Sequence, residues 1–233
     1  MAQTRLDRSL FRIEPLHIDH LPRFASFACG GENGADFVNF LKDDAYRLHE
    51  AHVSFTYLGF LELADQEAEE FVGYISLITD ALTLDPEEKA DLPSVRFGVL
   101  PALKVARLAT DLKAKNQIRG IGTALMAAAY TKAVQLAQSV AIRFLVVDAV
   151  EDAVKFYEKL GFIRNTSKTY LKKKMYTSMR LDLFAPKEPT WVFEEGATEA
   201  PPEDPPNPPH LDSGGRLDNF FQEHLGKSTP SNS

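Results

Sequence analysis

Residues 117–123 read Gln-Ile-Arg-Gly-Ile-Gly-Thr, with two glycines one residue apart. The preceding residues 105–110 favour a strand, and residues 124–134 are strong helix formers. Gly120 and Gly122 therefore lie where a strand leads into a helix, and glycine lets a ligand approach the main chain closely. The first N–H groups of a helix lack internal partners and carry the positive end of its dipole, so this junction predicts a phosphate-binding site. A glycine pair alone leaves a plain strand-to-helix connection open.

Two other nucleotide-binding motifs fit this stretch less well. A P-loop ends in Gly-Lys-Ser/Thr, whereas Gly122 is followed directly by Thr123 with no lysine. A Rossmann fingerprint has a third glycine three residues after the second, and Leu125 occupies that place.

The composition is that of a globular protein with an ordinary core. The chain has 233 residues, of which 44% are hydrophobic. The single cysteine, Cys29, excludes an internal disulfide and favours a reducing, cytoplasmic location. Residues 1–9 show no secretory signal, and no apolar run reaches the length of a membrane span, so we expect no membrane association.

Charge and proline divide the chain into two parts. Residues 187–233 hold three basic and nine acidic residues, which accounts for −6 of the net charge of −7, and eight of the 14 prolines. We therefore expect a folded domain over residues 1–186 and a disordered acidic, proline-rich tail over 187–233. Apolar residues recur at helical spacing within 216–225, which predicts a short helix that docks on the chain itself or in a partner's groove.

The remaining elements follow in mixed order. Expected strands cover residues 11–16, 53–63, 71–78, 96–110, 141–147, 162–164 and 175–184, and expected helices cover 36–50 and 151–160 besides the one after Gly122. This order predicts an α/β (α+β) fold, with helices flanking a central mixed, mostly antiparallel sheet that contains one parallel βαβ step.

Two motifs together resemble one enzyme superfamily. The pattern Gln117-x-x-Gly120-x-Gly122 is similar to the signature with which GNAT acetyltransferases seat the pyrophosphate of acetyl-CoA. Residues 153–162, Ala-Val-Lys-Phe-Tyr-Glu-Lys-Leu-Gly-Phe, resemble the second helix of the same superfamily. The resemblance implies the GNAT fold, acetyl-CoA as cosubstrate and N-acetyltransferase activity.

A finer resemblance points to one branch, the toxin acetyltransferases of bacterial toxin–antitoxin pairs, which acetylate aminoacyl-tRNA. It covers about two-thirds of the chain, through runs at residues 27–30, 37–42, 56–57, 72–77, 106–111 and 145–149. The branch implies aminoacyl-tRNA as acceptor, an antitoxin or other protein partner, and a homodimer. Residues 31–35 and the chain after Pro186 depart from the compact toxins.

The resemblance also assigns roles to individual residues. Tyr157 is the expected general acid, since a tyrosine with a pKa near 10 is protonated at neutral pH and the family places this hydroxyl beside the sulfur. The expected acceptor contacts are Arg107, from the toxin-like run at residues 106–109, and Lys172, Lys173 and Lys174, from the positive charge of their segment. The expected donor contacts are the backbone of Leu108, Ala109 and Thr110 along the pantetheine arm and the loop residues Gln117, Ile118, Arg119, Gly120, Ile121, Gly122 and Thr123.

Several other residues could carry chemistry, and simpler roles fit them better. Asp111 and Asp148 lie near strand ends, where aspartates commonly cap turns, so no general base is assigned. Cys29 has no partner for nucleophilic catalysis nearby in sequence. The pairs His17/His20 and His49/His52 lack further ligands in a metal-binding pattern, so we expect no metal site.

The positive charge near the second motif suits a polyanionic partner. Seven lysines and arginines and no acidic residue lie between Glu158 and Asp182, although a solvated lysine-rich hairpin explains the charge equally well. Two other functions stay open: acetylation of a small-molecule or protein amine, and a CoA-binding regulatory or adaptor domain without catalysis. Release of CoA thiol in the presence of amines separates the enzyme from the binding domain.

Overall fold

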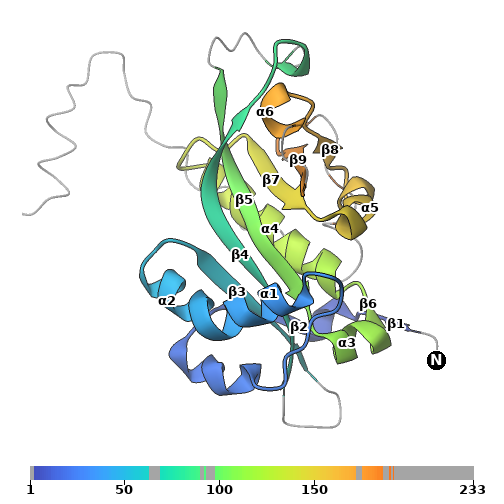
Figure 1. The fold of residues 1–233 in the computed structure, drawn as a ribbon. Coiled ribbons are helices and arrows are strands. Elements are labelled where there is room, and N and C mark those ends of the chain that lie inside the picture. The colour runs from blue at the N-terminus through green and yellow to red at the C-terminus, as the bar shows by residue number, and fades with distance from the viewer. Residues whose placement is uncertain are drawn as a thin grey trace, which may run out of the picture. The chain divides into compact units, whose positions relative to one another are not determined.

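A seven-stranded sheet with the order β2-β3-β4-β5-β7-β9-β8 crosses the unit formed by residues 1–196 (Figure 1). The computed structural model describes residues 3–62, 69–89, 92, 98–171, 175–185, 189 and 191. The strands of the large sheet are β2 (Phe11–Pro15), β3 (Phe55–Glu62), β4 (Glu69–Thr83), β5 (Val99–Thr110), β7 (Phe144–Ala149), β8 (Ile163–Arg164) and β9 (Thr177–Asp182). A separate two-stranded sheet pairs β1 (Thr4–Arg5) with β6 (Ile118–Arg119).

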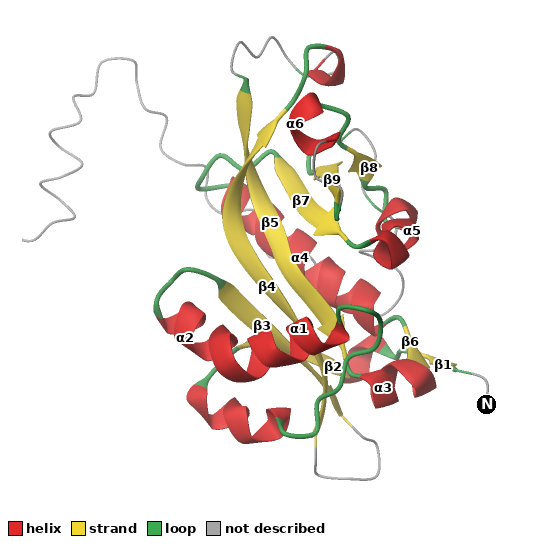
Figure 2. Cartoon of the chain, viewed as in Figure 1, coloured by secondary structure: helices red, strands yellow, loops and turns green. Residues whose placement is uncertain are grey.

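Helices cover both faces of the large sheet (Figure 2). One face carries the long helix α4 (Ile121–Ala137) and the shorter α5 (Glu151–Lys159). Part of the other face lies under a continuous helical run, α1 (Gly34–Asn39), the π-helical turn η3 (Phe40–Asp44) and α2 (Ala45–Glu50). The remaining short elements are α3 (Leu112–Gln117), α6 (Lys168–Leu171) and the 3-10 turns η1 (Arg8–Leu10), η2 (Ile18–Phe24) and η4 (Glu87–Lys89).

The central strands β5 and β7 are parallel, whereas every other neighbouring pair in the large sheet is antiparallel. Their pairing runs only from Ala102↔Phe144 to Val105↔Val147. On the β4 side, Leu77 pairs with Val105 and Ser76 with Arg107, so Ala106 is the extra residue of a β-bulge. A bulge bends its strand and increases the local twist, and the two parallel strands separate at this point.

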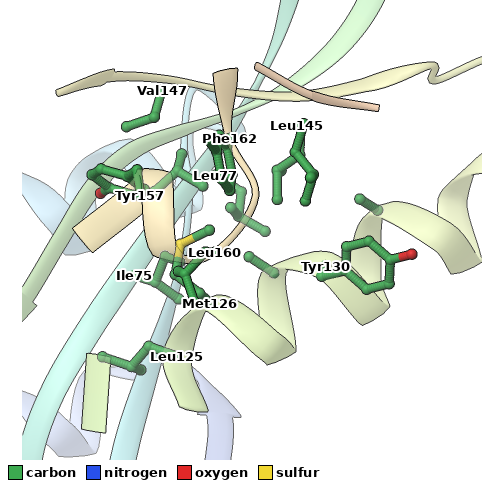
Figure 3. Packing of buried hydrophobic residues seen from close by; sticks show 14 of the residues in the cluster. Ile75, Leu77, Leu125, Met126, Tyr130, Leu145, Val147, Tyr157, Leu160 and Phe162 are labelled. Carbon is green, nitrogen blue, oxygen red and sulfur yellow. The ribbon is translucent and has the colours of Figure 1, made fainter. Parts of the chain in front are cut away.

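The main core lies between the sheet and the helices α4 and α5 (Figure 3). Leu125 and Met126 of α4 are fully buried there, together with Ile75 of β4 and Leu145 of β7. A second cluster lies under the α1–η3–α2 run and includes the stacked rings of Phe40 and Tyr74. Burial of this area supplies the main free energy that holds both helical layers on the sheet.

Trp191 extends the folded unit beyond the boundary that we expected at residue 186. Its side chain is buried, and its Nε1 donates a hydrogen bond to the Leu160 carbonyl at 2.9 Å. The indole meets the ring of Tyr130 edge-on at 5.8 Å, and Arg8 donates to the Trp191 carbonyl at 2.6 Å. The expected tail helix at 216–225 lies outside the described residues.

The α/β architecture predicted from the sequence is confirmed, and the differences are local. Helix α3, helix α6 and the β1–β6 pair were not expected. Strand β4 extends to Thr83, five residues beyond its expected end, because it continues to pair with β5 as far as Val99.

Candidate active site

A cavity of about 700 Å³ opens where β5 and β7 separate. Its walls come from the second half of β5, the loop that leads into α4, the end of β7 and the start of α5. Residues 29–33, which precede α1, form a further wall. The divergence of two parallel strands thus creates the cavity, and the N-terminus of α4 borders it.

The loop before α4 presents main-chain donors to this cavity. Gly120 has a φ of 104°, a left-handed conformation that glycine adopts without strain. The first internal hydrogen bond of the helix runs from the Ala124 N–H to the Gly120 carbonyl. Among the described residues, the N–H groups of Ile121, Gly122 and Thr123 have no acceptor, and all three residues line the cavity. This is the geometry that binds a phosphate at a helix N-terminus.

Gly122 has no structural need to be glycine in the free protein. A Cβ built on it would lie 3.5 Å from Phe156 Cζ and 3.9 Å from Leu108 Cδ2, which is ordinary van der Waals contact. Glycine at this place costs helix stability relative to alanine. The space that it leaves faces the cavity, so a ligand can approach the backbone there.

Strand β5 offers an open edge beside the loop. No described strand pairs with it on the β7 side after Val105. Leu108 and Thr110 line the cavity, whereas the Ala109 side chain is buried in the second core cluster on the opposite face. The free N–H and C=O groups of this edge can pair with an extended, amide-containing ligand as an added strand would.

Tyr157 of α5 reaches the same cavity from the other side. Its ring is 5% exposed and packs edge-on against Phe156 and Phe162, at 5.0 and 5.5 Å between centroids. Figure 3 shows it at the Val147 side of the main core. Burial raises the pKa of its hydroxyl above the ordinary value of 10, so the group stays protonated at neutral pH.

Arg107 also lines the cavity, from β5. Its guanidinium carbon lies 4.1 Å from the centre of the Phe40 ring, within the range of a cation–π contact. The nearby Tyr74 hydroxyl donates to the Phe37 carbonyl at 2.8 Å, which fixes the helical run above Arg107. The Phe40 ring therefore holds the positive charge of a residue that lines the cavity.

The two aspartates considered as bases have structural partners. Asp111 caps α3, since its Oδ1 accepts hydrogen bonds from the N–H groups of Lys113 at 2.9 Å and Ala114 at 3.1 Å. Asp148 accepts from Lys104 Nζ at 2.8 Å, and Asp80 lies 3.3 Å from the same nitrogen. Burial lowers the pKa of Lys104, but the carboxylates of Asp148 and Asp80 have the larger combined effect and raise this pKa above its ordinary value.

Some expected site residues lie elsewhere. Gln117 is the exposed last residue of α3 and does not line the cavity, whereas Ile118, Arg119 and the rest of the loop do. Lys172, Lys173 and Lys174 are outside the described residues. Cys29 lines the cavity half-buried, and desolvation raises the pKa of its thiol, which disfavours the reactive thiolate.

The sequence did not identify three other parts of the cavity wall. Gln3, Lys115 and the loop at residues 29–33 all line it. Ala28, just before this loop, is bound to the residues that follow β5: the Leu112 N–H donates to the Ala28 carbonyl at 2.8 Å, and the Ala28 N–H donates to Asp111 Oδ2 at 3.2 Å. These contacts join segments more than 80 residues apart, and no local sequence signal announces them.

Two further site types find no support in the described part of the chain. No three His, Cys, Asp or Glu side chains there come together as metal ligands would. His49 is instead packed, and its Nδ1 accepts the Thr56 N–H at 3.2 Å. Each helix in the described ranges is too short or too polar to cross a bilayer.

Several solved structures of bacterial toxins share this fold. A tyrosine-to-phenylalanine mutant of KacT is 21% identical and superimposes with a TM-score of 0.61, over 75% of this chain and 95% of KacT. AtaT complexed with acetyl-methionyl-tRNAfMet is 23% identical, with a TM-score of 0.60 over 74% of this chain and 94% of AtaT. A mutant AtaT toxin bound to the C-terminus of the antitoxin AtaR and acetyl-CoA is 22% identical, with a TM-score of 0.55 over 75% and 94% of the two chains.

The sequence itself carries the family assignment. Residues 31–183, well over half of the chain, match the acetyltransferase (GNAT) domain family. The matched range includes the strands β5 and β7, the glycine loop and Tyr157, so most of the residues that form the cavity belong to the matched domain. The chain therefore belongs to the GNAT acetyltransferases, enzymes that transfer an acetyl group from acetyl-CoA.

Proposed function

We propose that this protein transfers the acetyl group of acetyl-CoA to the amino group of an aminoacyl-tRNA. One observation carries the proposal. Residues 121–123 at the start of α4, Tyr157 and Arg107 all line a single cavity. The cavity thereby brings together N–H groups for the phosphates of the donor, an acid for the leaving group and a positive charge for the acceptor.

The donor half of the cavity matches the chemistry of acetyl-CoA. The N–H groups of Ile121, Gly122 and Thr123 would receive the pyrophosphate. The open edge of β5 at residues 108–110 would pair with the amides of the pantetheine arm. When bound, acetyl-CoA supplies an acetyl group activated as a thioester.

The chain's own residues would complete the transfer. The acceptor nitrogen attacks the thioester carbonyl as a neutral amine, and Tyr157 donates its proton to the sulfur as the C–S bond breaks. The proton that the nitrogen loses on forming the amide restores the Tyr157 hydroxyl. The amine of an aminoacyl ester is less basic than a lysine side chain, so a larger fraction is neutral at pH 7. A dedicated base is then less necessary, which is consistent with the structural roles of Asp111 and Asp148.

The acceptor assignment rests on charge and on similarity. Arg107 lines the cavity, and the segment from Lys159 to Arg180 holds seven basic residues and no acidic one. The fold is shared with AtaT, whose structure was solved with acetyl-methionyl-tRNAfMet. Contacts of lysine and arginine with tRNA phosphates would supply affinity, and the cavity would supply the chemistry. By the same similarity we propose an antitoxin-like protein partner and a cytoplasmic location.

The deciding experiment offers the purified protein a mixture of aminoacyl-tRNAs with labelled acetyl-CoA. We expect label on the amino groups of charged tRNA and none on uncharged tRNA. Reversal of Lys172, Lys173 and Lys174 to glutamate should weaken this reaction strongly and spare acetylation of a small amine, since only the tRNA carries phosphates. Label that reaches a small amine or a protein but never tRNA would replace this proposal with the other acetyltransferase function.

A further inference from the structure

The N-terminal strand β1 lies directly on the segment that leads into the phosphate-binding loop. Thr4 pairs in parallel with Ile118, and Arg5 with Arg119. The Leu6 N–H then donates to the Arg119 carbonyl at 3.0 Å. The segment is thus bound immediately before Gly120, by residues that are more than 110 positions away in the sequence.

The same N-terminal residues also form part of the cavity wall. Gln3 lines the cavity, and its Nε2 donates to the carbonyl of Lys115, another lining residue, at 2.6 Å. Leu6 packs against the main core, and its Cβ lies 3.5 Å from the place where Gly120 would carry a Cβ. Residues 3–6 therefore support both the end of α3 and the glycine loop.

Orientation of peptide groups explains why this support matters for binding. The carbonyl of Arg119 and the N–H of Gly120 belong to one planar trans peptide, so they point in opposite directions. A hydrogen bond that fixes the carbonyl against Leu6 also fixes the Arg119–Gly120 peptide, which leads directly into the three free N–H groups at residues 121–123. Donors that are already oriented bind an anion without the cost of ordering a loop.

We propose that residues Gln3–Leu6 are a positioning element of the donor site, which holds the loop 118–120 in the conformation that receives the pyrophosphate of acetyl-CoA. The inference rests on the proposed position of the pyrophosphate at α4. It does not depend on which amine is acetylated, and donor binding can be measured without any acceptor.

The test compares Leu6→Pro with Leu6→Ala. Both variants lose the leucine side chain, but only proline lacks the N–H that binds the Arg119 carbonyl. We expect Leu6→Pro to bind acetyl-CoA about tenfold more weakly than Leu6→Ala in calorimetry, the equivalent of about 1.4 kcal/mol. With S-acetyl-N-acetylcysteamine, a thioester donor without a pyrophosphate, the two variants should give equal kcat/KM.

Two results would overturn the proposal. Equal affinity of both variants for acetyl-CoA would show that the hydrogen bond does not position the loop. An equal loss with both donors would show general damage to the fold. If Leu6→Pro does not fold, Gln3→Ala decides, since it removes the bond to the Lys115 carbonyl from an exposed side chain. Gln3→Ala should weaken acetyl-CoA binding about threefold. It should leave kcat/KM with the short donor and the melting temperature unchanged. An unchanged affinity for acetyl-CoA would refute the positioning role.

Discussion

Gly122 at the start of α4 faces Phe156 of α5, and a Cβ on the glycine would lie 3.5 Å from Phe156 Cζ. The start of the helix that offers its N–H groups to the donor therefore lies close to the helix that carries Tyr157. At that distance a Cβ would be in ordinary van der Waals contact, so a side chain can begin at residue 122 without a clash at its first carbon. That makes it the sharpest probe of the donor site.

Gly122→Asp and Gly122→Asn should separate helix stability from donor binding. An aspartate in the first turn of a helix is stabilising, because its charge complements the helix dipole. We therefore expect the Gly122→Asp variant to unfold at the same or a higher temperature than the Gly122→Asn variant. The same charge would repel a pyrophosphate, so the Asp variant should bind acetyl-CoA at least about tenfold more weakly than the Asn variant. Calorimetry and thermal unfolding measure the two effects. Equal donor affinity of the two variants would place the pyrophosphate elsewhere.

Tyr157→Phe should lower kcat by a factor of about 10² to 10⁴ and leave acetyl-CoA affinity nearly unchanged. The substitution keeps the ring contacts with Phe156 and Phe162 and removes the proton that we assign to the leaving sulfur. Tyr130→Phe is the matched control, since Tyr130 lies in the same core but does not line the cavity. If both variants turn over at the wild-type rate, Tyr157 serves only as a packing residue.

The pH profile should show no loss of activity from Tyr157 up to about pH 10. Burial raises the pKa of this hydroxyl above its ordinary value of 10, and a proton donor fails only when pH exceeds its pKa. The rate should rise as the acceptor amine becomes neutral and then stay level. A fall of kcat with a midpoint below pH 9, absent from Tyr157→Phe, would mean that the hydroxyl ionises more easily than its burial allows.

Arg107→Ala should raise KM for aminoacyl-tRNA more than KM for a small amine. The guanidinium, held over Phe40 at 4.1 Å, offers a positive charge to an acceptor with phosphates. Donor affinity should stay within about twofold, because we place the phosphates of the donor at α4. Arg47→Ala is the control, since Arg47 is an exposed arginine on α2 that pairs with Asp44. Identical effects of both substitutions would remove Arg107 from the acceptor site.

Ending the chain at Pro186 should lower stability, and ending it at Gly196 should not. The shorter chain lacks Trp191, whose indole fills space beside Tyr130 and whose N–H satisfies the Leu160 carbonyl. We expect a loss of about 3 kcal/mol, at the low end of the range for removing a buried tryptophan. Urea unfolding of the two truncated chains and of Trp191→Ala measures it. Equal stability of the two chains would show that this contact contributes little.

The sequence predicted the parts of the fold that local patterns encode. Helix α4 follows the glycine loop as expected, but it begins at Ile121, three residues before the run of helix formers, and α5 begins at Glu151 as expected. The motifs also identified the cavity residues between Ile118 and Thr123, and Tyr157. In each case the signal lies within a few residues of the element that it specifies.

The rest depends on contacts between distant segments. The two-residue strands β1 and β6 form only because they meet each other, so neither has a pattern of its own. Gln3 and the loop at 29–33 reach the cavity through hydrogen bonds to Lys115 and to the end of β5. Helix α3 has a local signal, the cap Asp111, but its polar, lysine-rich residues show no apolar face.

Trp191 is the single tryptophan of the chain, so its position provides an intrinsic optical probe. Its indole is buried between Tyr130 of α4 and the carbonyl that follows α5, and the Trp191 carbonyl is bound by Arg8 near β1. Fluorescence emission excited at the indole band therefore reports on the junction of both site helices and the N-terminal segment. A red shift on addition of a ligand or partner, at constant circular dichroism, would register release of this residue while the domain stays folded.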